Sequence, residues 1–204
     1  MGLLKGAMSV RRFEVLGQPQ KNFENDYVDA FHDNAFRSNT DVLSEEVRCG
    51  WSTIHNLLDQ DFSDFERWYA DPYIFAMMRI DKKSVPANYM RAMVKQKMED
   101  WCLANSKDRV PTKIKREIKE STKNELLSKT LPKVKTVEFC WNVKESYLIL
   151  HTTSKTSIEQ FVKLFFESFG LGLDLFYPSH FIGDTQQRAL LESKSMSDIT
   201  FSGE

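Results

Sequence analysis

The chain has 204 residues, of which 41% are hydrophobic and 12% aromatic, a content that excludes an intrinsically disordered protein. Its net charge is −1, and no apolar run approaches the roughly 20 residues of a membrane span, so no membrane partner is expected. Three cysteines without a Cys-x-x-Cys pair and four scattered histidines indicate no disulfide framework, metal site or cofactor, and we expect the thiols to be mostly buried.

The N-terminal region predicts a strand followed by a helix. Residues 7–15 mix β-branched and aromatic residues with polar ones, which is typical of a strand. Phe23, Tyr27 and Phe31 then recur at every fourth position and form one apolar face of a helix.

The next segment has poor periodicity until a second strand begins. We expect residues 37–71 to be mostly loop, with short strand or helix pieces, and Gly50-Trp51 to mark a tight turn around a buried ring. Residues 73–80 are almost continuously apolar, which favours a strand that is covered on both faces.

Two prolines predict the starts of two helices, because proline lacks an N–H group that the first turn of a helix leaves unbonded anyway. The helix after Pro86 carries a methionine-rich stripe, which we interpret as core packing rather than a binding groove. The helix after Pro111 runs to about Thr130 and has few apolar positions. We expect the two helices to pair as a hairpin over residues 86–131 that projects from the sheet.

The most regular part of the chain predicts a strand, a turn, a strand, a helix and a strand. The strands are expected at 134–143, 147–153 and 171–177. Thr156 and Glu159 have the spacing of a capping box at the start of the helix, and Gly170 stops it. The fold class is therefore α+β, with an antiparallel or mixed sheet, packed helices and the projecting basic hairpin. The domain covers residues 1–177, and residues 178–204 are expected to be a polar, flexible tail.

Charge is strongly segregated along the chain. Between Arg79 and Lys135 lie sixteen Lys and Arg residues against seven Asp and Glu, a net charge of +9, so the flanks together carry −10. A concentrated positive charge attracts a polyanion, whereas the acidic remainder favours solubility. On charge alone, a solvated helical face is the more common explanation of such a segment.

Some of these cations fall on one face. Lys113, Arg116 and Lys123 lie within about a third of a turn of one another on an ideal helix. Lys133 and Lys135 share a face of the following strand, so the five could follow one phosphate backbone. Acidic residues nearby on the helix would make partial self-neutralisation the alternative. The candidate DNA-binding residues are Lys82, Lys83, Lys113, Arg116, Lys119, Lys123, Lys129, Lys133 and Lys135.

The acidic cluster at 59–66 is the one place where a metal-dependent nuclease centre could lie. A two-metal nuclease needs several carboxylates that converge on two ions. As a calcium loop the cluster fails, because Asp64 stands where glycine is required and Ala70 where the final glutamate is required. Acids interleaved with aromatic residues more often begin a helix.

The succession of these elements resembles the bacterial RdgC family of recombination-associated DNA-binding proteins. The resemblance is carried by Gly50-Trp51, residues 78–86, the lysine-rich helix before Leu131-Pro132-Lys133, the strand with Trp141, residues 148–150, and the helix 159–169 with Gly170. Family members of usual length continue beyond this point, so we expect a C-terminally reduced member.

What the resemblance implies is a ring-like homodimer that binds duplex DNA without sequence preference and restrains a recombinase filament. It also implies a nucleoid-associated protein in the cytoplasm, and the N-terminal apolar run is indeed too short for a secretory signal. Two other hypotheses stay open. One is a Mg²⁺-dependent exonuclease that uses the acids at 59–66, a label that proteins of this family sometimes carry. The other is a protein-interaction module whose basic face meets an acidic partner.

Overall fold

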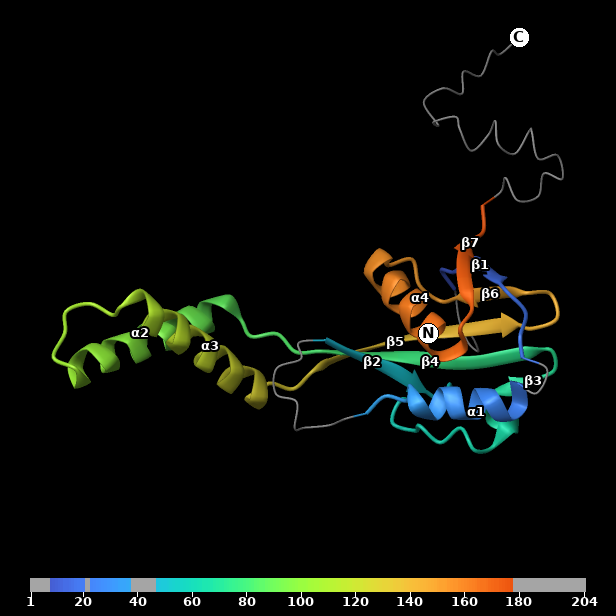
Figure 1. Ribbon diagram of the computed structural model, residues 1–204, viewed down its shortest axis with the longest axis horizontal. Helices are drawn as coiled ribbons and strands as arrows, with labels where there is room; N and C mark the ends of the chain where they lie inside the picture. The colour runs from blue at the N-terminus through green and yellow to red at the C-terminus, as the bar shows by residue number, and fades with distance from the viewer. Residues whose placement is uncertain (1–7, 21–22, 38–46, 178–204) are drawn as a thin grey trace, which may run out of the picture.

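The computed structural model describes residues 8–20, 23–37 and 47–177. Two parts are distinct in Figure 1, an α+β body and a helical hairpin that projects from it. The helices are α1 (Phe23–Asp33), α2 (Ala87–Ala104), α3 (Thr112–Lys129) and α4 (Lys155–Phe169), with a short 3-10 helix at Phe65–Arg67. The strands are β1 (Arg11–Leu16), β2 (Val47–Ser52), β3 (Tyr69–Ala70), β4 (Tyr73–Lys82), β5 (Lys133–Asn142), β6 (Tyr147–Leu150) and β7 (Gly172–Leu175).

Within the described residues the sheet has seven strands, and every pair of neighbours is antiparallel. The order is β2-β4-β5-β6-β1-β7, with β3 pairing the end of β4 beside β2. The expected α+β class is confirmed, and the sheet is the antiparallel one of the two expected forms. No described helix combines the length and the apolar character that crossing a membrane would require.

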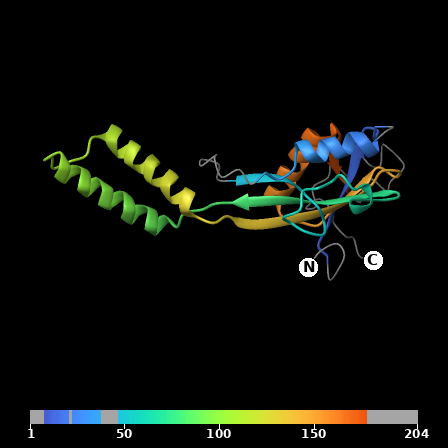
Figure 2. The same cartoon turned by 90° about the horizontal axis from the view of Figure 1, so that it is seen from below.

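The core lies between one face of the sheet and two helices. Figure 2 shows α1 and α4 on the same side of the strands. Phe31 of α1 is fully buried at the centre, where its ring stacks on Phe62 at 4.4 Å between centroids and meets Trp51, Trp68 and Phe169 edge to face. Large aromatic side chains contribute most per residue to such a core, because each buries about 150–250 Å².

The pair Gly50-Trp51 is the first correction to the sequence-based expectation. It does not form a turn but lies within β2, although the ring of Trp51 is buried as expected. The glycine is needed because a Cβ there would sit 2.6 Å from the backbone N and Cα of Phe36. That close approach lets Trp51 exchange backbone hydrogen bonds of 2.9 Å with Asn34 and Phe36, which lie beside the outer edge of β2.

The other expected elements are found with modest shifts, except for two details. In its described part, the segment 37–71 is mostly loop with the short pieces β2, the 3-10 helix and β3, as expected. The capping box does not form, because α4 begins after Ser154, and Gly170 ends it in a left-handed conformation as expected. The thiols are also less buried than expected, since Cys49 is exposed while Cys102 and Cys140 are half-buried. The expected tail at 178–204 lies outside the described residues.

The hairpin is the expected pair of helices, but it is packed less tightly than the methionine stripe suggested. Helices α2 and α3 lie against each other and extend away from the body (Figures 1 and 2). In the described structure no residue of α2 is buried, and α3 buries only Thr122, Leu126 and Leu127, all in its second half. The stripe therefore packs on one helix only and stays half-exposed, because nothing in the described chain covers its other side.

Candidate nucleic-acid interface

The neck of the hairpin is the end of the sheet at which β4 leads into α2 and α3 leads into β5, with β2 on the other side of β4 as far as Lys82. The register pairs Lys82 with Lys133 and Ile80 with Lys135. Lys82 and Lys133 therefore face each other directly across the ladder, as the last pair before the hairpin. Like charges in that position repel each other, so this arrangement is more stable when an anion is bound between or beside them.

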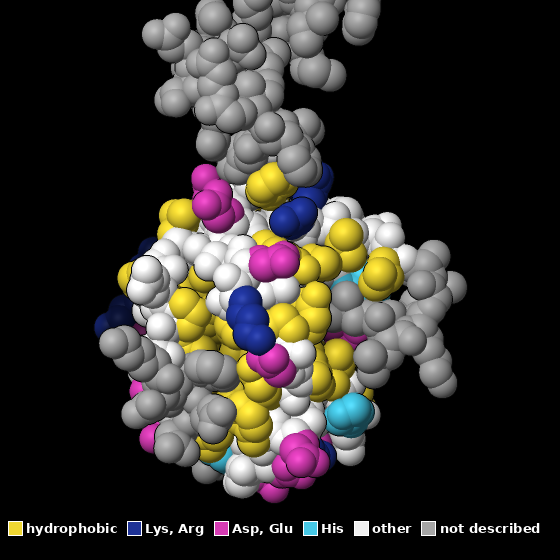
Figure 3. Space-filling view, turned by 90° about the vertical axis from the view of Figure 1, so that its right-hand side faces the viewer, with side chains coloured by type: hydrophobic (Ala, Val, Ile, Leu, Met, Phe, Trp, Pro, Cys, Tyr) yellow, Lys and Arg dark blue, Asp and Glu magenta, His cyan; other side chains and the backbone are white. Residues whose placement is uncertain are grey.

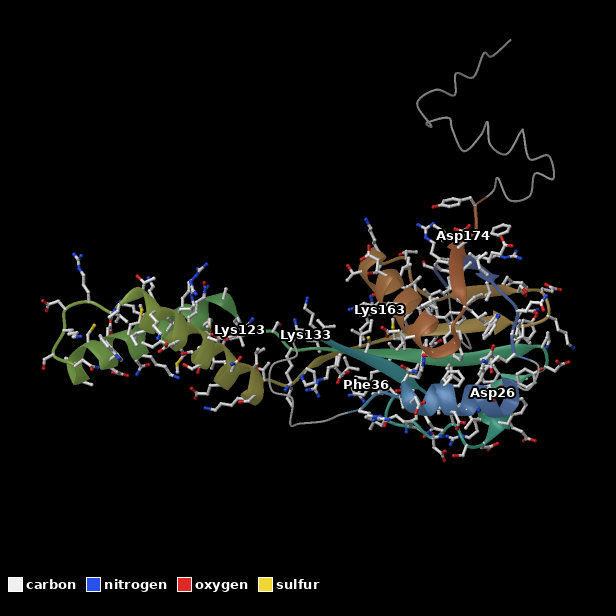
Figure 4. All side chains as sticks on the ribbon, in the orientation of Figure 1. Asp26, Phe36, Lys123, Lys133, Lys163 and Asp174 are labelled. Carbon is white, nitrogen blue, oxygen red and sulfur yellow. The ribbon has the colours of Figure 1, made fainter. Side chains whose placement is uncertain are left out.

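The two lysines of β5 share one face, as the alternation of the strand predicted, but their surroundings differ. Lys135 donates a hydrogen bond of 2.7 Å to the Oγ of Ser157 in α4 and is thereby held against the body. Lys133 is exposed, and Figure 4 shows it at the junction between body and hairpin.

A cavity of about 350 Å³ lies at the root of the hairpin, where the start of α2 meets the second half of α3. It brings together four of the candidate residues from two separate segments of the chain. They are Lys82 at the end of β4, Lys83 directly after it, and Lys119 and Lys123 from α3. Figure 4 labels Lys123 in this region of the hairpin.

Two further candidates lie toward the outer end of the hairpin. Lys113 and Arg116 are in the first turns of α3, which starts at the end of the hairpin remote from the sheet. Both are exposed, and Glu117 and Glu120 do not neutralise them through direct contact. Within the described part of the chain, neither cation forms an ion pair.

The charge of Lys129 is offset by an acidic neighbour. Glu125 accepts hydrogen bonds of 2.6 Å from both Lys129 and Lys97, and so bridges α3 to α2. The bonds from Lys129 and then Lys97 lower the pKa of the Glu125 carboxyl from 4.5 to about 2. The three side chains together carry a net charge of only +1, so Lys129 contributes less to the field than its position suggested.

Arg79 is basic in the sequence but does not belong to the basic surface. Its side chain is on β4, and the residue is 7% exposed, while Asp81 is 8% exposed. The guanidinium donates two hydrogen bonds of 2.8 and 2.7 Å to the Asp81 carboxylate, and it lies 4.1 Å from the ring centroid of Phe36. This neutral pair fixes the end of the sheet from which the neck leaves. Sequence reasoning missed it, although acid and base two apart on one strand face were a readable signal.

The charge distribution on the body is different. Figure 3, which faces the end of the body remote from the hairpin, shows acidic and basic side chains scattered among apolar ones, with no continuous basic surface. Because the residues outside 79–135 carry a net charge of −10, the basic character belongs to the segment that holds the neck and the hairpin.

Comparison with known protein families shows which family the chain belongs to. The family model described as "Putative exonuclease, RdgC" matches residues 7–179, which is most of the chain. The chain belongs to the RdgC family. The match includes the body, the neck and the whole hairpin, so the basic surface lies within the family domain. Among curated proteins, no match to the chain is found.

The word exonuclease in the family description makes the acidic cluster at 59–66 a second candidate site, because nuclease centres are built from carboxylates. Asp59 pairs with Arg67, Asp61 accepts from the backbone N–H of Ser63 at 3.0 Å, and Asp64 caps the short helix by accepting from the N–H of Glu66 at 3.1 Å. The pKa of Asp59 is lowered chiefly by the hydrogen bond that its carboxylate accepts from the backbone N–H of Asp61. The pKa of Asp61 is lowered chiefly by its bonds from Ser63.

The acids thus serve the local loop geometry, including the helix start that the sequence predicted. In the residues that the structure describes, no group of three or more His, Cys, Asp or Glu side chains is arranged to hold a metal ion.

Proposed function

We propose that this RdgC-family protein binds duplex DNA without sequence preference through the neck and the hairpin. One observation carries the proposal, the gathering of lysines from β4, α3 and β5 on a projection with a net charge of +9 over residues 79–135. Exposed Lys and Arg on such a surface neutralise phosphates and release counterions, which gives affinity on any sequence. No acidic side chain is paired with Lys113 or Arg116 in the described chain, so their charges are available to a polyanion.

The test is a salt titration of binding to two unrelated duplexes. The affinity should fall steeply with salt, with a slope of about −0.9 per phosphate contacted. Lys113→Ala/Arg116→Ala should reduce that slope by about two on both duplexes, because each cation contributes about one contact. Lys144→Ala is the control. Lys144 lies in the turn between β5 and β6, away from the neck, and pairs with Asp71. Slopes that do not change in the double variant would show that the hairpin is only a solvated face.

We also propose that the protein acts as a homodimer through the outer part of the hairpin. A groove of about 730 Å³ there is lined by Met98, Cys102, Leu103 and Val110, and Leu103 is 80% exposed. Its rim carries both signs of charge, from Lys95, Glu99, Asp108, Arg109 and Lys115. In a twofold contact the same patch of both copies meets. The apolar residues of one groove then lie against those of the other, and rim charges of opposite sign can pair.

Sedimentation equilibrium tests the homodimer. Leu103→Asp should shift the protein toward monomer without loss of helix, because the side chain is exposed in the single chain. Leu131→Asp is the matched control, since Leu131 is 88% exposed at the other end of the hairpin. A wild-type protein that sediments as a monomer at tens of micromolar, on the order of concentrations that populate weak dimers, would refute the dimer.

The connection to recombination rests on family membership. A protein that covers duplex DNA without sequence preference withholds it from a recombinase filament, and it would act at the nucleoid in the cytoplasm. In a strand-exchange assay, the wild type should inhibit a recombinase more strongly than Lys113→Ala/Arg116→Ala. Equal inhibition by both proteins would separate this role from DNA binding.

A further inference from the structure

The cavity at the root of the hairpin has a more specific chemistry than the rest of the basic surface. Four ammonium groups line it, from Lys82, Lys83, Lys119 and Lys123, and no acidic side chain is among the described residues of its wall. Lys83 is half-buried, whereas Lys113 and Arg116 farther along the hairpin are exposed on an open helix surface. A concave site with this charge is suited to an anion that fits inside it, not to diffuse attraction.

The start of α2 lies at the same cavity. Ser84 and Ala87 line the cavity, and the helix begins at Ala87 after Pro86. The side chain of Pro86 makes no capping hydrogen bond, so the cap residue does not satisfy the N–H groups of the first turn. These N–H groups carry the positive end of the helix dipole, which favours an anion at this end of the helix.

The pairing of β4 with β5 supplies an independent reason for an anion here. Lys82, which lines the cavity, lies directly opposite Lys133 in the ladder. Two like charges in this register repel unless a counter-charge is close. An anion in the cavity would supply that counter-charge to Lys82 at the last pair of the β4–β5 ladder.

We propose that this cavity binds a single phosphoryl group, with Lys83 and Lys119 as the principal side-chain contacts and the first turn of α2 as the backbone contact. The volume is near the lower end of the roughly 300–1,000 Å³ that ligand sites occupy, so a phosphate with an attached sugar fits it. Val85, Met90 and Leu127 give the cavity an apolar side against which the sugar can lie. The inference rests on the proposed function in one respect, namely that DNA is the molecule that carries the phosphoryl group. The group is then either a backbone phosphodiester or a terminal phosphate.

The experiment follows the backbone amides of Ala87 and Asn88 by ¹⁵N NMR in the full chain. The probes are inorganic phosphate, a nucleoside 5′-monophosphate, and one short duplex with and without 5′-phosphates. Both amides should shift with the small phosphates. A shift with the duplex that lacks terminal phosphates identifies a backbone phosphodiester, and a shift that requires the 5′-phosphate identifies a strand end.

Variants of equal charge decide whether the cavity is responsible. Lys83→Ala/Lys119→Ala should weaken nucleoside monophosphate binding by about tenfold or more, as expected when charge-assisted contacts are lost. Lys113→Ala/Arg116→Ala removes the same charge outside the cavity and should change that affinity by less than about twofold, since exposed charges contribute little at a distance. Lys83→Arg/Lys119→Arg keeps the charge and should retain binding if the fold is intact.

Equal losses in the two alanine variants, or amides of the first turn that no phosphate probe shifts, would overturn the inference while DNA binding could still stand. A wild type that binds no duplex in the salt titration, but whose Ala87 amide still shifts with nucleoside monophosphate, would instead refute the proposed function and leave the phosphoryl site.

Discussion

The buried ion pair at the base of the neck allows a prediction in which a single and a double substitution have very different effects. Asp81→Ala leaves the guanidinium of Arg79 in a place where the residue is only 7% exposed, with its two hydrogen bonds to the carboxylate lost. Breaking a buried pair in this way costs about 3–5 kcal/mol of unfolding free energy, because an uncompensated charge stays buried. The low exposure of both partners means that water screens the loss very little.

Arg79→Met/Asp81→Leu removes both charges and should recover most of that stability. Replacing a buried ion pair by apolar side chains of similar size is often neutral or better. Methionine also keeps a contact with the ring of Phe36, since a thioether packs well against aromatic edges. The carbonyl of Leu57 loses the bond of 3.4 Å from Arg79, but Leu57 is exposed and water can replace that bond. The double variant should therefore lie within about 1 kcal/mol of the wild type.

Equilibrium urea denaturation, followed by the fluorescence of the buried tryptophans, measures both variants. Glu99→Ala is the control, because it breaks the exposed pair with Lys95, whose nitrogen and oxygen atoms are 3.7 Å apart. Exposed pairs of this kind contribute only roughly 0.3–0.5 kcal/mol. A loss below about 1 kcal/mol for Asp81→Ala would refute the argument from an uncompensated buried charge. A double variant as unstable as the single one would refute it too.

Three further outcomes are expected. Gly50→Ala should lower the unfolding free energy by about 1–3 kcal/mol in thermal or urea unfolding, because the new Cβ would meet the backbone of Phe36 at 2.6 Å; a loss too small to detect would show that the edge segment moves freely. The folded-state pKa of Glu125 is lowered to about 2, so the stability it contributes is present above its ordinary pKa of 4.5 and is lost as the pH falls through about 2. Circular dichroism against pH should therefore show a small loss of helix in the wild type over this range and a smaller one in Glu125→Gln, because exposed ion pairs contribute little; parallel curves would contradict the bridge from Glu125 to Lys97 and Lys129. Asp61→Asn keeps an acceptor for the local turn and should leave DNA affinity unchanged or slightly higher; a wild type that degrades DNA with Mg²⁺ while this variant does not would make the acidic loop catalytic.

The elements that sequence reasoning placed well are those whose pattern is set by local chemistry. The helix that ends at Gly170 and the strands on either side of it follow from periodicity and from one glycine that can adopt a positive φ, observed at 67°. The hairpin follows from Pro86 and Pro111, each directly before a helix. In these segments, local propensity and tertiary packing favour the same conformation.

The elements that sequence reasoning missed depend on contacts between distant segments. β2 has no clean alternation, and its glycine suggests a turn, because the reason for that glycine lies in a segment some fifteen residues earlier in the chain. Asp81 and Arg79 each count as one charge in a sum over the sequence, yet together they are internal and neutral. The opposition of Lys82 and Lys133 also requires the register of the ladder, which composition does not specify.

Packing along the hairpin explains why the two proposed contacts would lie at opposite ends of it. Near the body, Leu126 and Leu127 are buried, so the side chains around the lysine cavity are held on a well-packed base. Binding of one phosphoryl group needs such fixed geometry, because donors must stay within a fraction of an ångström of their places. At the outer end Leu103 is 80% exposed, which leaves apolar surface for a partner. Substitutions at the outer end should therefore change assembly with little effect on phosphate binding, whereas the loss of packing at Leu126 would disturb the cavity and the neck together.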